Sequence, residues 1–289
     1  LSGRPWLRHL VKTIAPAPLQ LWAWRHFSRI TYSNLSAALP PADFGAGDIL
    51  VAGDAGWGYD VWACARAAQR RGARVVTILY DLIPLNHPEY CSEAHQLLFR
   101  QWLPGALATS DAILCISEAS RAELARHCEA NQLRCAPSAA FRLGGDLPPA
   151  AAHAPASSRM PAGAPYFLSV GSIEPRKDHA LLLDAFERAW SGGLDARLAI
   201  VGRPVDGAQA TVARIRAHAE LGKRLFLFTD ADDAELDTLY RGARAVVLAS
   251  RAEGFGLPLV EARQRGCAVM ATRLPAFEER ADEGVRLFA

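Results

Sequence analysis

Residues 243–266 read ARAVVLASRAEGFGLPLVEARQRG. The continuous apolar run at 243–250 predicts a strand that is covered on both faces. A Gly-Phe-Gly turn at 254–256 follows it, and then Pro258 suits the first turn of a helix that Gly266 would close. A strand, a tight turn and a helix in this order are typical of a parallel α/β sheet, where ligands bind at the carboxyl ends of the strands.

The same alternation runs through most of the chain from Asp48 onward. Apolar runs predict strands at 48–53, 73–80, 111–116, 166–171, 196–202, 224–228, 243–250 and 267–272. Helical patterns lie between them near 58–71, 92–109, 118–129, 178–190, 207–221, 232–241 and 257–265. Such units join parallel strands by right-handed crossovers. The predicted fold is therefore α/β, with two Rossmann-like doubly wound parallel-sheet domains that face a cleft.

A stretch poor in large apolar residues separates the two halves. Residues 144–165, GGDLPPAAAHAPASSRMPAGAP, are rich in Pro, Ala, Gly and Ser, which is typical of a linker. We place the N-terminal, acceptor-side domain at 1–150, the linker at 151–165 and the C-terminal, donor-side domain at 166–289. The chain starts without methionine and stops inside the apolar stretch VRLFA, so we expect a trimmed sequence.

Composition indicates a protein with a substantial core and excludes two broad classes. The 289 residues are 51% hydrophobic and 21% charged, and the net charge of +2 does not predict a nucleic-acid partner. No apolar run approaches the ~18 residues that a membrane span needs. The six cysteines are scattered without a CxxC pair, which favours buried free thiols and a cytoplasmic location.

Residues 1–42 contain no acidic residue, but five cations and three tryptophans. Basic and aromatic residues at loose helical spacing can lie on an anionic membrane surface, which predicts a peripheral membrane contact through residues 1–30. The alternative is a helical hairpin packed on its own domain, because Pro16 and Pro18 interrupt a long amphipathic helix.

Residues 171–179, GSIEPRKDH, follow the predicted strand 166–171. Arg176 and Lys177 stand at the expected start of a helix, where cations oppose the helix dipole. Free backbone N–H groups and two added cations attract an anion, so we predict a diphosphate site. The alternative is a solvated Arg-Lys pair with ordinary capping by Asp178.

Two glutamates, Glu253 and Glu261, flank the glycine turn. The glycines let backbone N–H groups approach a phosphate. Carboxylates accept hydrogen bonds from hydroxyls, and a nucleotide sugar offers hydroxyls on both sides of its diphosphate. We therefore predict that one carboxylate meets the sugar and the other the ribose. The alternative is that both only favour the helix start, by about 0.3–1 kcal/mol each.

These motifs together resemble the retaining GT-B glycosyltransferases of family 4, whose donor domain carries an E-x7-E motif and an upstream Arg-Lys pair. The matching stretches are EGFGLPLVE at 253–261, SIEPRKDH at 172–179 and FTDADDAELDTLYRGARAVVLAS at 228–250. The resemblance is strong over residues 166–280. It extends more loosely to the first half through YDLIPLNHPEY at 80–90 and CISEAS at 115–120.

The resemblance implies a role for each matching residue of the donor domain. Arg176 and Lys177 bind the diphosphate and stabilise the leaving nucleotide, and Glu253 contacts the transferred sugar. Glu261 accepts hydrogen bonds from the ribose, and Gly171 lets the diphosphate come close. The other implied donor contacts are the backbone of Gly254, Phe255, Gly256 and Leu257 at the sugar and phosphate, and Thr229 and Asp230 at the base.

The acceptor side departs from the family pattern at one position. Many relatives carry a His-Asp pair where this chain has Tyr80 and Asp81, so no histidine role near the reacting carbon carries over. Asp81 would orient an acceptor hydroxyl; the alternative is that it caps the turn before Pro84. Ser117 and Ser120 look like helix N-terminal residues that face the cleft, although as caps they need no further function.

The resemblance implies transfer of a hexose, with retention of configuration, to a growing bacterial surface glycan that could be lipid-linked. Negative charge grows on the leaving diphosphate, so preorganised cations act more strongly in the transition state than before it. No Asp-x-Asp pair serves the phosphate site, so we expect no essential metal and no cofactor. Resemblance to mannosyltransferases points to GDP-mannose, with UDP- and dTDP-sugars as alternatives.

Two other functions stay open. One is an epimerase or phosphorylase of similar two-domain form, although a phosphorylase needs a pyridoxal-phosphate lysine and the chain has only Lys12, Lys177 and Lys223. The other is a non-catalytic chain that binds a nucleotide sugar or partner proteins.

Overall fold

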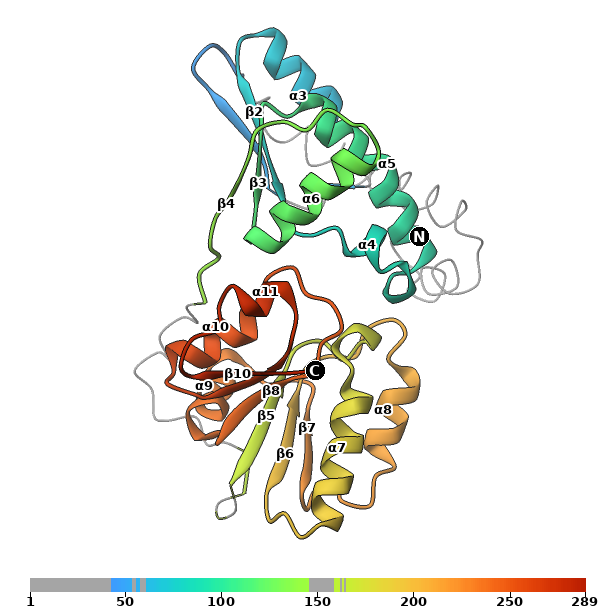
Figure 1. Ribbon diagram of the computed structural model, residues 1–289, viewed down its shortest axis with the longest axis vertical. Helices are drawn as coiled ribbons and strands as arrows, with labels where there is room; N and C mark the ends of the chain where they lie inside the picture. Colours follow the sequence, from blue (N-terminus) through green and yellow to red (C-terminus); the bar gives the residue numbers. More distant parts are fainter. Residues whose placement is uncertain (1–42, 54–55, 58–60, 146–158, 162, 164) are drawn as a thin grey trace, which may run out of the picture. The chain divides into compact units, whose positions relative to one another are not determined.

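The chain folds into two compact units, Leu1–Phe141 and Arg142–Ala289, each built on one parallel sheet (Figure 1). The structure, a computed structural model, describes residues 43–53, 56–57, 61–145, 159–161, 163 and 165–289. The predicted membrane contact at residues 1–30 and most of the predicted linker lie outside these residues.

The first unit has a four-stranded sheet in the order β1-β2-β3-β4, with every neighbouring pair parallel. Its strands are β1 (Ile49–Ala52), β2 (Arg74–Leu79), β3 (Ala112–Cys115) and β4 (Ser138–Ala140). The connecting helices are α3 (Val61–Arg70), α5 (Glu93–Thr109) and α6 (Glu118–Ala130), and β2 is followed by the short α4 (Ile83–Asn86) and η1 (Pro88–Tyr90). Aromatic side chains of α3 and α5, among them Trp62, Phe99 and Trp102, form much of its core.

The second unit has a six-stranded parallel sheet in the order β10-β9-β8-β5-β6-β7. Its strands are β5 (Tyr166–Val170), β6 (Arg197–Val201), β7 (Leu225–Phe228), β8 (Ala245–Leu248), β9 (Val269–Thr272) and β10 (Val285–Phe288). Its helices are α7 (His179–Ser191), α8 (Gln209–Arg216), α9 (Asp233–Gly242), α10 (Leu257–Gln264) and α11 (Pro275–Glu278), with η2 (Pro175–Lys177) before α7. This is the strand order of a dinucleotide-binding Rossmann sheet.

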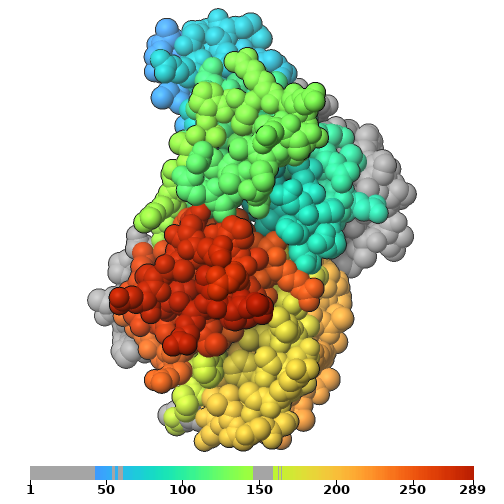
Figure 2. All heavy atoms as spheres, in the orientation of Figure 1, coloured from blue at the N-terminus to red at the C-terminus, as the bar shows by residue number. Residues whose placement is uncertain are grey.

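Helices cover both faces of this second sheet, which is why its strands are apolar throughout. One core cluster packs side chains of α9, α10 and α11, such as Leu239, Leu259 and Phe277, against the sheet. A separate cluster packs α7 and α8 against the opposite face. In the space-filling view the C-terminal segment, drawn in red, forms one continuous flank of the unit (Figure 2). The predicted α/β class with two parallel sheets is therefore confirmed.

Several elements differ from the predicted ones. Helix α8 ends at Arg216 rather than near residue 221, and β4, β10, α4 and α11 were not predicted. Each of these four elements has three or four residues, too few to show a period. The terminal VRLF is an edge strand that pairs with β9. All six cysteines are free, but Cys64 is exposed rather than buried.

Candidate active site

The strand order of the second unit reverses between β5 and β8. After β5 the chain builds β6 and β7 on one side, and it then returns to add β8, β9 and β10 on the other. Strand β5 pairs with β8 through Phe167 and Ala245. The loops at the carboxyl ends of these two strands therefore lie next to each other, and in open α/β sheets this reversal point is where ligands bind.

The two loops bring the predicted cations and the first glutamate into direct contact. Arg176 Nη1 donates to Glu253 Oε2 at 3.0 Å, and Lys177 Nζ donates to Glu253 Oε1. Arg176 also donates to the carbonyl oxygen of Ala252 at 2.7 Å. Ser250, at the end of β8, donates its hydroxyl to Glu253 at 2.8 Å. The loops after β5 and β8 thus share one charged cluster.

Arg176 and Lys177 lie just before the helix rather than on it. They belong to η2, and Asp178, with φ of 48°, is the N-cap of α7 and accepts from Leu181 N at 3.2 Å. The predicted capping by Asp178 is present. The pair is not solvated, because the Arg176 and Lys177 side chains are 18% and 12% exposed.

The charges in this cluster balance each other. Burial would raise the pKa of Glu253, but Lys177 and Arg176 overcome it and hold that pKa below its usual value. Glu174 accepts from Arg176 at 2.7 Å and from the Ser172 hydroxyl at 2.9 Å. Glu253 is therefore ionised at neutral pH, and the cluster contains carboxylates as well as cations.

Two glycines make the close packing beneath Lys177 possible. Gly171, with φ of 141°, ends β5, and a Cβ there would lie 3.3 Å from Lys177 Cε. Gly202 ends β6, and a Cβ there would lie 1.9 Å from the Gly171 carbonyl oxygen. Sequence reasoning missed Gly202, although Val201-Gly202 repeats the Val170-Gly171 ending of the neighbouring strand.

Glu261 lies on α10 and is held by a different group. The buried Tyr240 donates its hydroxyl to Glu261 Oε2 at 2.6 Å, and Arg265 donates to the Glu261 carbonyl oxygen at 2.9 Å. Burial and the Glu261 charge raise the pKa of Tyr240, so it stays a hydroxyl donor. Sequence reasoning missed Tyr240, because a tyrosine in a helix normally suggests only core packing.

The glycine turn between the two glutamates is mostly buried. Gly254, Phe255 and Gly256 are buried, whereas Leu257 is 39% exposed. Gly256, with φ of 87°, is the N-cap of α10, and a Cβ there would lie 2.5 Å from Phe277 Cε1. The turn therefore requires glycine at this position. Pro258 is the second residue of α10 rather than the first.

The guanidinium of Arg280 stacks on the ring of Phe255 at 3.8 Å. Burial lowers the pKa of Arg280, and its neighbour Glu279 forms an ion pair with it. Arg280 is a basic residue beside the glycine turn that the sequence pattern did not indicate.

Thr229 and Asp230 follow β7, at the carboxyl edge where the base contact is predicted. Asp230 is exposed and pairs with Arg159 at 2.9 Å. Arg159 also pairs with Glu235 at 2.7 Å, and its guanidinium lies 5.1 Å from the Phe228 ring centre. Asp230 thus has a partner that sequence reasoning did not predict.

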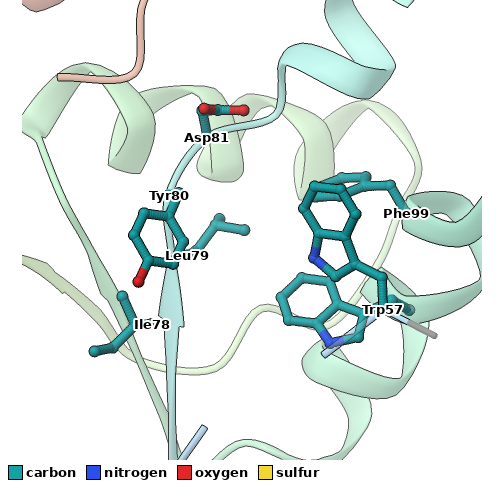
Figure 3. A pocket seen from close by; sticks show the side chains of 7 residues that line it. Trp57, Ile78, Leu79, Tyr80, Asp81 and Phe99 are labelled. Atoms are coloured by element: carbon teal, nitrogen blue, oxygen red, sulfur yellow. The ribbon is translucent and has the colours of Figure 1, made fainter. Parts of the chain in front are cut away.

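In the first unit, Tyr80 and Asp81 line an aromatic cavity of about 240 Å³ at the carboxyl end of β2. Figure 3 shows Tyr80 and Leu79 on one wall and Trp57 and Phe99 on the other, with Asp81 near one end. The other described residues that line it are Ile78 and Trp102.

Asp81 and Tyr80 also have structural partners. Asp81 Oδ1 accepts from Ile83 N at 3.0 Å, which is the turn capping considered as the alternative. The Tyr80 hydroxyl donates to the Gly53 carbonyl oxygen at 2.7 Å, and the Tyr80 side chain stays 41% exposed.

Ser117 and Ser120 lie at the start of α6, as expected of helix N-terminal residues. They are 2% and 1% exposed, and Ser117 caps α6 by accepting from Ser120 N at 2.9 Å. The Ser120 hydroxyl donates to the Tyr80 carbonyl oxygen at 2.9 Å. The small polar residues at this helix start therefore fix the backbone that carries Tyr80 and Asp81.

No three His, Cys, Asp or Glu side chains within the described ranges come together as a metal ion would need. None of the helices in this part of the chain has both the length and the hydropathy required to cross a bilayer.

Comparison with known proteins finds a family similarity in the second unit. Residues 153–288 match the family model of glycosyl transferases group 1. The serotype-specific mannosyltransferase WbdA of Escherichia coli is 35% identical over 241 residues, which are 78% of this chain and 29% of WbdA. The O-antigen chain mannosyltransferase RfbU of Salmonella typhimurium is 31% identical over 115 residues, 39% of this chain and 31% of RfbU. The chain thus spans less than a third of the length of these relatives.

The fold is also similar to that of a solved structure. Anabaena HepE in complex with UDP and glucose superposes with a TM-score of 0.62 at 18% identity, over 84% of this chain and 64% of HepE. At this identity the likeness concerns the fold alone. Together with the two parallel sheets, it shows the GT-B fold. Residues 153–288 are therefore similar to glycosyl transferases group 1, within a chain that has the GT-B fold.

Proposed function

We propose that the chain is a retaining glycosyltransferase that transfers mannose from GDP-mannose to a growing bacterial surface glycan. The observation that carries the proposal is the meeting of Arg176, Lys177 and Glu253 at the strand-order reversal. The mannosyltransferase names of WbdA and RfbU support the sugar. The retaining course and the GDP base rest on the sequence resemblance.

The proposed chemistry follows from where charge appears. When the bond from the anomeric carbon to the diphosphate breaks, negative charge grows on the leaving oxygen. Arg176 and Lys177 are held in place by the hydrogen bonds that they donate to the neighbouring loop, so they need little reorganisation to stabilise that charge. Glu253 would turn to the sugar hydroxyls, and Glu261, positioned by Tyr240, would accept from the ribose.

We also propose that the reaction needs no cofactor and no metal ion. The two cations next to the diphosphate supply the charge stabilisation that Mg²⁺ supplies in many phosphate-transfer sites. The remaining donor contacts are assigned to Gly171, Thr229, Asp230 and the 254–257 turn.

The donor is tested with a panel of sugar nucleotides. We expect GDP-mannose to raise the melting temperature more than UDP- or dTDP-hexoses, because bound ligand stabilises the folded state by mass action. Radiolabelled mannose should be transferred to an oligomannoside acceptor. The transfer rate should be unchanged in EDTA, and the new linkage should have the anomeric configuration of the donor. Binding without transfer would favour the non-catalytic alternative, and no binding to any nucleoside diphosphate would exclude the enzyme proposal.

On the acceptor side we propose that Asp81 orients the attacking hydroxyl at the mouth of the aromatic cavity. The aromatic rings of Trp57, Tyr80, Phe99 and Trp102 around this cavity suit the apolar face of a sugar ring, and Asp81 is the only carboxylate among the described residues that line it.

Replacing Asp81 by asparagine separates this role from turn capping. Asparagine Oδ1 can still accept from Ile83 N, so the turn before α4 keeps this hydrogen bond, but the negative charge is lost. We expect kcat/KM for the acceptor to fall by about 10²-fold, with GDP affinity and melting temperature unchanged. Undiminished transfer by Asp81→Asn would leave Asp81 as a capping residue only.

We further propose that the protein works at the cytoplasmic side of the membrane, where residues 1–30 would contact anionic lipid. Co-sedimentation with phosphatidylglycerol vesicles, compared with phosphatidylcholine vesicles, tests this placement. Equal binding to both would remove the proposed contact.

A further inference from the structure

Glu253 forms ion pairs with both of the cations that the proposed diphosphate would use. Its two carboxylate oxygens are divided between them, with Oε1 on Lys177 and Oε2 on Arg176 at 3.0 Å. The Glu253 side chain is only 7% exposed, and Ser250 supplies a third hydrogen bond. A diphosphate that binds Arg176 and Lys177 therefore has to compete with this carboxylate.

The surrounding charges make the competition matter. Two further carboxylates bind cations at this point: Glu174 pairs with Arg176 at 2.7 Å, and Asp178 pairs with Arg251 at 2.7 Å. The group contains the cations Arg176, Lys177 and Arg251 and the carboxylates Glu174, Asp178 and Glu253, so its formal charge is zero.

The adjacent His179 does not change this balance. Burial, followed by the Lys177 charge, lowers the pKa of His179 to about 4, so its imidazole is neutral at neutral pH. A polyanion that approaches the intact group therefore meets no net positive charge. The group presents a net positive charge only when Glu253 moves away from Arg176 and Lys177.

We infer that Glu253 is a specificity-determining residue that makes the site favour an intact nucleotide sugar over a bare diphosphate. This inference rests on the proposed function. A hexose joined to the diphosphate presents hydroxyl donors to the displaced carboxylate, which compensates Glu253 for the loss of Arg176 and Lys177. A nucleoside diphosphate presents no hydroxyl on that side, so Glu253 returns to the cations and displaces it.

The same competition has a consequence for turnover. After transfer, the product nucleotide has lost the hexose that kept Glu253 away from the cations. The carboxylate then regains them, and the nucleoside diphosphate dissociates faster. Glu253 thus weakens product binding without weakening donor binding equally.

The test compares inorganic diphosphate and GDP binding to the wild-type chain and to Glu253→Gln by isothermal titration calorimetry. Glutamine keeps the length and the hydrogen bond with Ser250 but removes the charge. We expect both ligands to bind about tenfold more tightly, which corresponds to about 1.4 kcal/mol. The affinity should also become more sensitive to salt, while sugar transfer falls.

A matched control removes the same charge elsewhere in the unit. Glu187 lies on α7, nine residues beyond the N-cap Asp178. Like Glu253, it bridges two basic side chains, Arg214 at 2.9 Å and His218 at 2.9 Å. Glu187→Gln should leave diphosphate affinity within twofold of wild type. An equal gain in this control would mean that only the overall charge matters, which would overturn the inference.

A second variant keeps the site electroneutral in case Glu253→Gln does not fold. In Glu253→Asp the carboxylate is one methylene shorter and cannot span both cations, so we expect a gain of about threefold in diphosphate affinity. Melting curves establish that each variant is folded before titration.

The outcomes separate this inference from the proposed function. If the wild type binds GDP but both Glu253 variants bind it equally or more weakly, the competition is excluded and the proposed function stands. If the variants bind more tightly but the wild type transfers no hexose, the competition holds and the proposed function fails. If no form binds any diphosphate, both are wrong.

Discussion

Replacement of Lys177 by alanine is expected to lower kcat/KM for sugar transfer by about 10²–10³-fold. The Lys177 side chain is 12% exposed, and its ammonium group lies at the strand-order reversal, where it would stabilise the charge that develops on the leaving diphosphate. Loss of one preorganised donor at such a position typically costs a factor of this size. Initial rates with saturating and limiting donor would show a fall in kcat, and not only a rise in KM, because the interaction strengthens in the transition state.

The matched control is Lys223→Ala, which removes the same group from an exposed position of the same unit. Its transfer rate should equal that of the wild type. In Lys177→Ala, Glu253 still has Arg176 and Ser250 as partners, so the variant should remain folded. A Lys177→Ala protein that melts normally and transfers within threefold of wild type would contradict the assigned role.

The sequence predicted the long elements of the fold well, because most strands of the two sheets are continuous apolar runs. The strand at 166–171 and the helix at 178–190 differ from β5 and α7 by one residue at their ends. Elements of three or four residues escaped prediction. β4 is made of Ser138, Ala139 and Ala140, which have no apolar character of their own, and its pairing with β3 depends on the rest of the sheet.

The candidate site was predicted in its parts but not in its contacts. Spacing along the chain placed Arg176, Lys177 and Glu253 at neighbouring strand ends, since β5 and β8 are the strands that meet where the order reverses. Spacing could not show that Glu253 binds both cations, because side-chain pairing depends on loop geometry. Spacing also could not show that Ser117 is buried, because a helix cap has the same sequence pattern whether its side chain is buried or exposed.

Gly202 shows what a residue without a side chain can contribute to such a site. We expect Gly202→Ala to lower the free energy of unfolding by about 3 kcal/mol, because a Cβ would lie 1.9 Å from the Gly171 carbonyl oxygen, and backbone cannot rotate aside as a side chain can. For a unit of this size the melting temperature should fall by about 6–12 °C, measured by calorimetry. Relief of the clash would shift Gly171, which packs against Lys177, because a Cβ on Gly171 would lie 3.3 Å from Lys177 Cε. Sugar transfer should therefore also fall at temperatures where the variant is folded.

The control for Gly202→Ala is Gly193→Ala, at the turn that follows α7. Gly193 has φ of 91°, but a Cβ there would meet nothing within 4 Å, so alanine introduces backbone strain of about 1–2 kcal/mol without a clash. Gly193→Ala should therefore melt somewhat lower and transfer sugar at the wild-type rate. The comparison separates loss of stability from displacement of the loop that carries Lys177. If Gly202→Ala melts and transfers like the wild type, the close approach of β5 and β6 at their carboxyl ends is not what positions that lysine, and its position would have to come from the pairing with Glu253 alone.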